Sequence, residues 1–395
     1  MWNGTPAEVG KAALDSAKAA VELALGLVGY MALFLGLMKI VEEAGGLAFM
    51  ARLIRPILVR IFPDVPADHP AMGAMVMNIA ANALGLGNAA TPFGLKAMKE
   101  LNALNPNPGT ATNAMVLFLA INTSGLALLP TGIIGLRALE GSSSPAAIFP
   151  TTLIATGLST ICGILAAKLF CRLPPFAPPA EQRQAAEEVL AKREALRVQE
   201  LFPLFLFGFI LVGGVTAVYV LGEAASAWIM PGLIFGMVSF GVLRGVKVYE
   251  TFIVGAKEAF QLATTIIPYL VAILTSVGMF RASGGLQALT GRLGSLTEPL
   301  GLPAEVLSLA FLRPLSGSGS FGITAEILKT HGPDSYIGNL ASTMNGSTET
   351  TFYVLAVYFG SVGVSRLRHA VWAGLSADIM GVFASVLAVR MLLGA

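Results

Sequence analysis

Long apolar runs, separated by short polar or glycine-rich breaks, divide this chain of 395 residues. A transmembrane α-helix needs about 20 predominantly apolar residues, and several runs approach that length. The expected helical runs are Ala20–Ile40, Ala111–Leu139, Phe149–Phe170, Phe202–Leu221, Ala225–Leu243, Glu250–Phe280 and Ala370–Leu393. The pattern predicts an all-α, polytopic integral membrane protein.

Two of the apolar runs are interrupted by polar residues. The run Ala111–Leu139 is broken at Asn122-Thr123-Ser124-Gly125 and again at Pro130, and the run Asn339–Tyr358 is broken at Asn345–Thr350. Irregular backbone at membrane depth is tolerated only where protein or a water-filled cavity surrounds it. Each run therefore predicts a broken transmembrane helix.

Two further stretches have short apolar arms around a glycine-rich centre. In His69–Leu101 the centre is Asn82–Asn88, and in Leu309–Leu328 it is Arg313–Ser320. Each arm is about half a membrane span, which favours a re-entrant hairpin. For the first stretch, a single crossing with a glycine-rich packing face is the alternative. Leu47–Phe62, with three arginines among apolar residues, is expected to be an interfacial amphipathic helix.

These features recur in the same order in two halves of the chain. The stretch starting at Ala17 aligns with the stretch starting at Ala256, an offset of 256 − 17 = 239, and both keep a tyrosine and a Gly-Gly-Leu. NALGLGN then aligns with PLSGSGS, and INTSG with MNGST. Such repeats are typical of transporters. The expected organisation is a first repeat over 1–172, a charged linker over 173–200 and a second repeat over 201–395.

Charge predicts how the repeats are oriented. Five predicted crossings, an odd number, precede Glu250–Phe280 if the hairpins do not cross, so the repeats are expected to be inverted. With the linker cytoplasmic, most of the 25 Lys and Arg residues fall on the inside, as the positive-inside rule requires. The predicted location is the bacterial inner membrane, with several passes.

Composition agrees with this class and excludes others. Hydrophobic residues form 55% of the chain and charged residues 12%, against about 25% charged residues in soluble domains. With three scattered His and two Cys, a metal site is not expected. Nucleic-acid binding is not expected either, because the basic residues do not form a separate patch. Gly317–Gly322 matches G-x-G-x-x-G but lacks the strand context of a dinucleotide site. With no catalytic motif, an enzyme is not expected.

The polar breaks supply the candidate binding residues, since helix ends and free backbone groups there can hold a ligand. The candidates are Asn82, Asn88, Asn122, Thr123, Ser124, Arg313, Ser316, Ser318, Ser320, Asn345, Ser347, Thr348 and Glu349. The alternative for the glycines is close helix packing. Arg313 and Glu349 are expected to form an ion pair or share a ligand, or only to lock the hairpin. Asp378 is expected to be a packing or cation contact, and the histidines to be solvated.

The residues of the breaks also resemble a known family. NIAANALGLGNAATPFGLKAMKEL and LFLAINTSGLALLPT resemble spore maturation protein A, while PLSGSGSFGITAEIL and ASTMNGSTETTFYVLAVYFG resemble spore maturation protein B. The resemblance covers nearly the whole chain except the linker. It implies a fusion of two nucleoside-recognition, or Gate, domains, shared in outline with concentrative nucleoside transporters and ferrous-iron permeases.

The predicted function is a permease for a small polar metabolite, nucleoside-like or a small organic anion, bound at the midplane between the repeats. No cofactor is expected beyond Na⁺ or H⁺ as a candidate coupling ion. The expected partners are the substrate, the bilayer and, as an open alternative, further copies of the chain. The competing hypothesis is a non-transporting scaffold that recruits partners through the Pro174–Glu200 helix.

Overall fold

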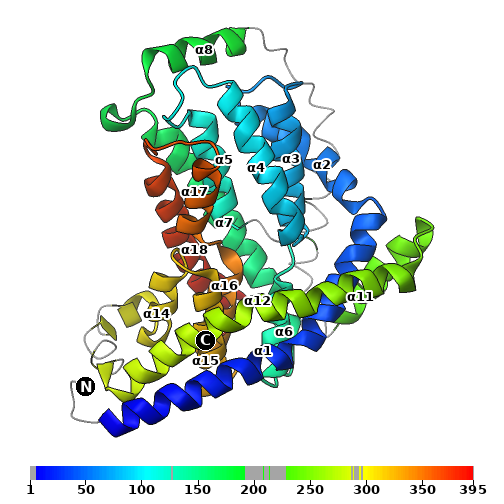
Figure 1. The fold of residues 1–395 in the computed structure, drawn as a ribbon, viewed down its shortest axis with the longest axis vertical. Coiled ribbons are helices and arrows are strands. Elements are labelled where there is room, and N and C mark those ends of the chain that lie inside the picture. The colour runs from blue at the N-terminus through cyan, green and yellow to red at the C-terminus, as the bar shows by residue number, and fades with distance from the viewer. Residues whose placement is uncertain are drawn as a thin grey trace.

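The computed structural model describes residues 6–125, 128–191, 228–285 and 297–394, together with 208, 213, 288, 293 and 294. Over this part of the chain the elements are α-helices and short 3₁₀ turns, with an isolated bridge between Thr110 and Arg366 and no strand (Figure 1). The predicted all-α class is confirmed.

The first half contains a long helix, a shorter amphipathic helix, a helical hairpin, a broken helix and a closing helix. Their bounds are α1 Pro6–Glu43, α2 Gly46–Ile61, α3 Pro70–Ala83, α4 Gly87–Ala103, α5 Asn113–Thr123, α6 Thr131–Leu139, η1 Pro145–Ala147 and α7 Ile148–Phe170. The linker begins with η2 Pro174–Phe176 and α8 Ala180–Ala191, and its residues 192–200 lie outside the described part.

The second half repeats the long helix, the hairpin, the broken helix and the closing helix. The described elements are α11 Ile229–Leu243, α12 Val248–Ala282, η4 Glu298–Leu300, α14 Ala304–Leu312, α15 Gly317–His331, α16 Tyr336–Ser347, α17 Thr351–Gly360 and α18 Ala370–Leu392. The order of elements therefore matches the repeat seen in the sequence. The predicted span Phe202–Leu221 lies outside the described residues, apart from 208 and 213.

Three of the described helices are long and apolar enough to cross a membrane: Pro6–Glu43, Pro145–Phe170 and Ala370–Leu392. They cover the predicted runs Ala20–Ile40, Phe149–Phe170 and, except for its last residue, Ala370–Leu393. Their length and composition are those of a membrane protein. The first predicted run lies within one continuous helix of 38 residues, α1, which no proline interrupts after Pro6.

The amphipathic helix α2 has the predicted two faces. Arg52, Arg55 and Arg60 are exposed, while Leu53 and Leu58 are buried in the largest apolar core, which α2 shares with α3, α4, α5 and α17. Pro56 lies inside the helix without ending it.

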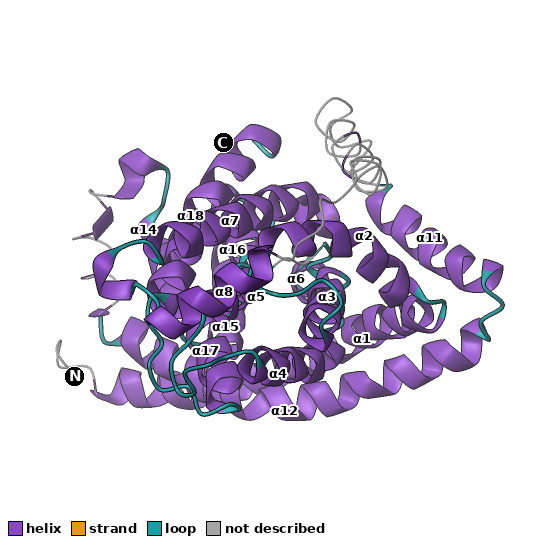
Figure 2. Cartoon of the chain, turned by 90° about the horizontal axis from the view of Figure 1, so that it is seen from above, coloured by secondary structure: helices purple, strands orange, loops and turns teal. Residues whose placement is uncertain are grey.

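Equivalent helices of the two halves pack antiparallel. A Cβ at Gly163 of α7 would lie 3.2 Å from the Cβ of Ala377 of α18, and Ser159 donates a hydrogen bond of 2.8 Å to the Ala377 carbonyl. Helices α1 and α12 also run side by side in opposite directions (Figures 1 and 2). Small residues permit these close approaches, as in other membrane helix pairs.

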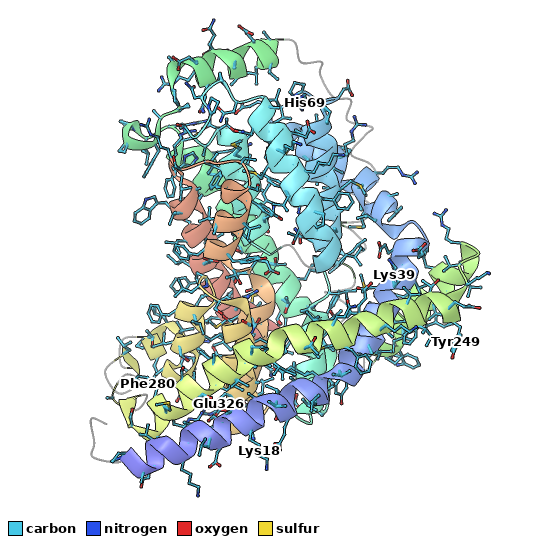
Figure 3. The ribbon with its side chains drawn as sticks, in the orientation of Figure 1. Lys18, Lys39, His69, Tyr249, Phe280 and Glu326 are labelled. Carbon is cyan, nitrogen blue, oxygen red and sulfur yellow. The ribbon has the colours of Figure 1, made fainter. Side chains whose placement is uncertain are left out.

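The end of α12 is fixed to the second hairpin. Arg281 in its last turn forms an ion pair with Glu326 of α15, and Figure 3 shows Glu326 and Phe280 along this part of α12. This contact ties the end of α12 to α15.

Candidate functional site

The two broken helices meet at their breaks. The backbone N–H of Glu349 donates a hydrogen bond of 2.8 Å to the carbonyl of Thr123. Gly125 has φ +61°, and a Cβ there would lie only 2.7 Å from the carbonyl carbon of Thr348. The contact joins Thr123–Gly125, at the end of α5, to Thr348–Glu349, after α16, so the breaks of the two halves touch.

Each hairpin tip contacts the broken helix of its own half. Leu128, after the first break, donates 2.9 Å to the carbonyl of Ala83 at the end of α3. Phe352, at the start of α17, donates 3.0 Å to the carbonyl of Pro314 between α14 and α15. The first residues of α15 and α17 are therefore brought to the same place as the breaks.

Arg313 brings a positive charge to this crossing. Its Nη2 donates to the carbonyl of Thr348 and lies 3.8 Å from Oε2 of Glu349. The Arg313 side chain is only 12% exposed and its Nε has no partner, whereas the Glu349 side chain is 54% exposed. The predicted contact between the two residues is present, and the carboxylate remains accessible to a ligand.

The polar side chains of the first break form hydrogen bonds with other groups of the protein. Asn82 donates 3.0 Å to Oδ1 of Asn122, whose amide donates to a carbonyl of α5. The hydroxyls of Thr123 and Ser124 donate to α5 carbonyls at 3.1 and 2.7 Å. These bonds replace the intrahelical partners that the end of α5 lacks. The side chain of Asn88 lies outside the described part of the structure.

The serines of the second hairpin differ in their surroundings. Ser316 caps α15 by accepting 3.0 Å from the N–H of Gly319, and Ser320 donates 2.7 Å to the Ser316 carbonyl. Ser318 instead lines a cavity of about 280 Å³ between α1, α6, α12 and α15, beside Tyr30. We therefore expect Ser318, rather than Ser316 or Ser320, to reach a ligand without giving up a hydrogen bond.

The second break is likewise satisfied internally. Asn345 donates 2.7 Å to Oγ1 of Thr324 on α15, and Ser347 donates 3.0 Å to the carbonyl of Met344. The Thr348 side chain is buried, and its carbonyl accepts from Arg313. Of the predicted binding residues, Ser318 lines the cavity, Glu349 is exposed and Arg313 lies beside Glu349. The binding role of all of them remains a prediction.

Two buried side chains among the described residues, the acidic Asp378 and the basic Arg137, were not among the predicted binding residues. Asp378 of α18 is 6% exposed and accepts 2.7 Å from Oγ1 of Thr351, the first residue of α17. Arg137 of α6 is 1% exposed and donates to carbonyls of Pro145 and Pro333 and to Asp334 at 3.0 Å. Asp378 could be noticed as an acid inside an apolar run, but nothing in the sequence indicates the partners of Arg137.

The Arg137 network fixes the connection before η1 to the connection before α16. Asp334 accepts hydrogen bonds from Ser142 and Ser143 as well as from Arg137. Burial alone would raise the pKa of Asp334, but these hydrogen bonds and the charge of Arg137 together lower it. The ionised Asp334 therefore holds the two halves together at this end.

The expectation of solvated histidines is wrong for His369. His331 is exposed, but His369 is fully buried at the start of α18, with its ring 6.2 Å from that of Phe176. The fold brings η2 over it, which the sequence does not indicate. His69 caps α3 by accepting 3.2 Å from the N–H of Ala71. Within the described residues, no group of three or more His, Cys, Asp or Glu could hold a metal ion.

Comparison with known proteins gives matches over both halves. The model of the Gate family, described as nucleoside recognition, matches residues 24–170 and 263–365. Spore maturation protein B of Bacillus subtilis (strain 168) is 44% identical over 169 residues, which are 43% of this chain and 95% of that protein. Spore maturation protein A of the same organism is 43% identical over 170 residues, which are 43% of this chain and 87% of that protein.

Proposed function

The chain belongs to the Gate family of nucleoside-recognition membrane proteins, and from this premise we propose that it is a permease for a small polar metabolite. The substrate is nucleoside-like or a small organic anion, and Na⁺ or H⁺ is the candidate coupling ion. The family is described by recognition and not by a catalytic activity, so we propose no reaction.

The contact between the two breaks is the observation that carries this proposal. Glu349 and Thr123 join the broken helices through a 2.8 Å hydrogen bond. Broken helices that meet between two repeats are where many transporters bind substrates. A scaffold would have no need for two interrupted helices at the centre of the molecule, because each interruption frees backbone groups that must be satisfied elsewhere.

The chemistry of the crossing favours a ligand with negative charge or hydrogen-bond acceptors. Arg313 supplies a cation that is largely shielded from solvent. The helices α15 and α17 begin beside it, at Gly317 and Thr351, and helix N-termini attract negative charge. Glu349 and Ser318 add polar groups that can accept hydrogen bonds from ligand hydroxyls or amines.

We further propose that the two repeats are inverted in the bacterial inner membrane and that both hairpins are re-entrant. The antiparallel pairs α1–α12 and α7–α18 support inversion. Arg366 and Arg368 lie in a connection that contacts the start of the linker, where Arg368 donates 3.0 Å to the Phe176 carbonyl. Basic residues gathered at the linker support a cytoplasmic position for that end.

Uptake by the purified protein in proteoliposomes tests the proposal. Nucleosides, nucleobases, amino acids and dicarboxylates should be screened as radiolabelled compounds, and we expect saturable uptake of at least one. Arg313→Gln should reduce that uptake by about tenfold or more, the value of a charged hydrogen bond. Arg172→Gln, which removes an exposed charge at the linker end, is the matched control and should transport normally.

Failure of the well-folded protein to take up any of these compounds would contradict the proposal. Binding of cytosolic proteins to the α8 helix, with no uptake, would favour the scaffold hypothesis instead.

A further inference from the structure

Asp378 is a buried carboxyl group in the middle of an apolar helix. It is 6% exposed, and α18 around it is one of the three helices apolar enough to span a membrane. Its Oδ2 accepts 2.7 Å from the hydroxyl of Thr351, but its Oδ1 is buried without a hydrogen-bond partner. A membrane helix rarely retains an acid in such a position unless the acid has a function.

The carboxyl lies directly beside the crossing of the broken helices. Gly374, one turn before it on α18, lets the helix approach so closely that a Cβ there would lie 2.6 Å from Cγ2 of Thr351 and 3.6 Å from Oγ1 of Thr123. Thr351 begins α17 immediately after the break, and Thr123 ends α5 at the other break. A change in either broken helix would therefore change the surroundings of Asp378.

Glu349, the other acid at the crossing, has a different environment. More than half of its side chain is exposed, and it lies 3.8 Å from Arg313. An exposed and paired carboxylate can stay ionised at little cost. Asp378 has a single hydroxyl as its partner, so its ionised form leaves a buried charge poorly compensated, and one bound proton removes that charge.

Among the described residues, no charged group hydrogen-bonds to Asp378, and the charge of Arg313 acts on it only from a distance. The elements that pack against α18 are α5, α7, α16 and α17. Their titratable or charged side chains, with those of the break and the hairpin tip, are Cys162, Lys168, Tyr336, Glu349, Tyr353, Tyr358 and Arg313. Within the part of the chain that the structure describes, Thr351 alone hydrogen-bonds to the carboxyl. One side-chain oxygen is too few to complete a cation site around a carboxylate, which again favours a proton.

We propose that Asp378 binds and releases the proton that couples transport, an inference that rests on the proposed permease function. A proton from the water on one side of the membrane converts the carboxylate to the neutral acid, which is the form suited to the buried conformation. When the broken helices move and admit water from the other side, the acid releases the same proton there. No other reactant is needed, and the residue returns to its starting form.

Carbodiimide labelling tests proton binding without knowledge of the substrate. Dicyclohexylcarbodiimide reacts with protonated carboxyl groups that are shielded from water, and mass spectrometry of the α18 peptide locates the adduct. In the wild-type protein in proteoliposomes, we expect an adduct on Asp378 at acid pH that is lost at alkaline pH and is unaffected by Na⁺. Asp378→Asn should lose the adduct. Glu22→Gln, which removes an exposed acid of α1, is the control and should keep it.

Absence of the adduct in the wild-type protein, or an adduct independent of pH, would overturn the proposal. Protection by Na⁺ at constant pH would overturn it in favour of a sodium site. For a compound found in the uptake screen, Asp378→Asn should lose accumulation driven by a pH gradient but retain exchange of internal for external compound.

These readouts separate the two proposals. A pH-dependent adduct in a protein that transports nothing would contradict the permease function, and with it the coupling role, while proton binding at Asp378 would stand. Accumulation that stays driven by the pH gradient in Asp378→Asn would contradict only the role of Asp378.

Discussion

Arg313 has two partners, the buried carbonyl of Thr348 and the exposed carboxylate of Glu349. The difference between them determines how replacing Arg313 affects stability. The Thr348 carbonyl, at the end of α16, belongs to the buried break, whereas Glu349 is 54% exposed. Leaving a buried acceptor without its donor lowers the free energy of unfolding more than breaking a half-exposed ion pair does. The two residues therefore do not form a simple balanced pair within the membrane.

A double-mutant cycle tests whether Arg313 and Glu349 stabilise the protein as a pair. Glu349→Gln should destabilise the protein by about 1 kcal/mol or less, and Arg313→Gln by about 1–3 kcal/mol because the Thr348 carbonyl loses its donor. Their coupling should stay below about 1 kcal/mol. Thermal melting in detergent measures the three variants. A Glu349→Gln protein destabilised by several kcal/mol and restored by Arg313→Gln would show instead that the pair locks the hairpin.

His369 gives the chain a predicted sensitivity to acid outside its membrane spans. Burial and, to a smaller extent, the charge of Arg368 lower its pKa from 6.5 to about 4. Between these values the unfolded chain binds a proton that the folded chain does not, so stability is lost as pH falls from about 6.5 towards 4.

The expected loss is on the order of 2 kcal/mol, seen as a fall in Tm over this range. His369→Phe should remove this part of the pH dependence, whereas His331→Asn, at an exposed site, should leave it unchanged. An unaltered acid slope in His369→Phe would mean that other groups cause it.

At the scale of elements, Gly125 is the glycine through which the first break contacts the backbone of the second. Gly125 has φ +61°, and a Cβ there would overlap sterically with the backbone of Thr348. Gly141 also has positive φ, +80°, but has nothing within 4 Å of its Cβ position. The two sites share the backbone strain and differ only in the contact.

Gly125→Ala should therefore cost more than Gly141→Ala. Left-handed strain contributes about 1–2 kcal/mol at both sites, and overlap with the second break adds about 1–3 kcal/mol at Gly125 alone. Tm and uptake should both fall in Gly125→Ala, and uptake should be kept in Gly141→Ala. Equal losses at both sites would argue against a functional contact between the breaks.

The elements that the sequence predicts well are those set by local patterns. The exposed arginines of α2 and the breaks after Thr123 and Ser347 follow from hydropathy and from glycine and serine positions. Contacts between distant residues were not predictable in the same way. Arg137 binds Asp334, 197 positions away, and His369 is buried by η2 from the linker. Neither contact produces a periodic pattern of apolar and polar residues from which it could be predicted.

The whole molecule is organised by pairs of equivalent elements. The long helices α1 and α12 lie together, the closing helices α7 and α18 lie together, and the breaks touch at Thr123 and Glu349. The connections on either side are tied separately, by the Arg137 network at one end and by Arg368 with the linker at the other. The contact between the breaks lies between two fixed ends, which is where an alternating opening would act.

The separation of these two ends predicts how the protein lies in the membrane. Thr330, before the Arg137 network, and Glu188 of α8 are both exposed. If the repeats are inverted and the linker is cytoplasmic, the two positions are on opposite sides of the bilayer. Each should be changed to cysteine singly, in a background in which Cys162 and Cys171 are replaced by serine.

A membrane-impermeant maleimide added to intact cells should label Thr330→Cys and leave Glu188→Cys unlabelled until the membrane is permeabilised. The reason is that, by the positive-inside rule, basic residues near the linker are expected to keep that end on the cytoplasmic side. Full labelling of both variants after permeabilisation is the control for accessibility. Labelling of Glu188→Cys in intact cells would place the linker outside, and labelling of both variants there would place the two ends on one side and contradict the inverted arrangement.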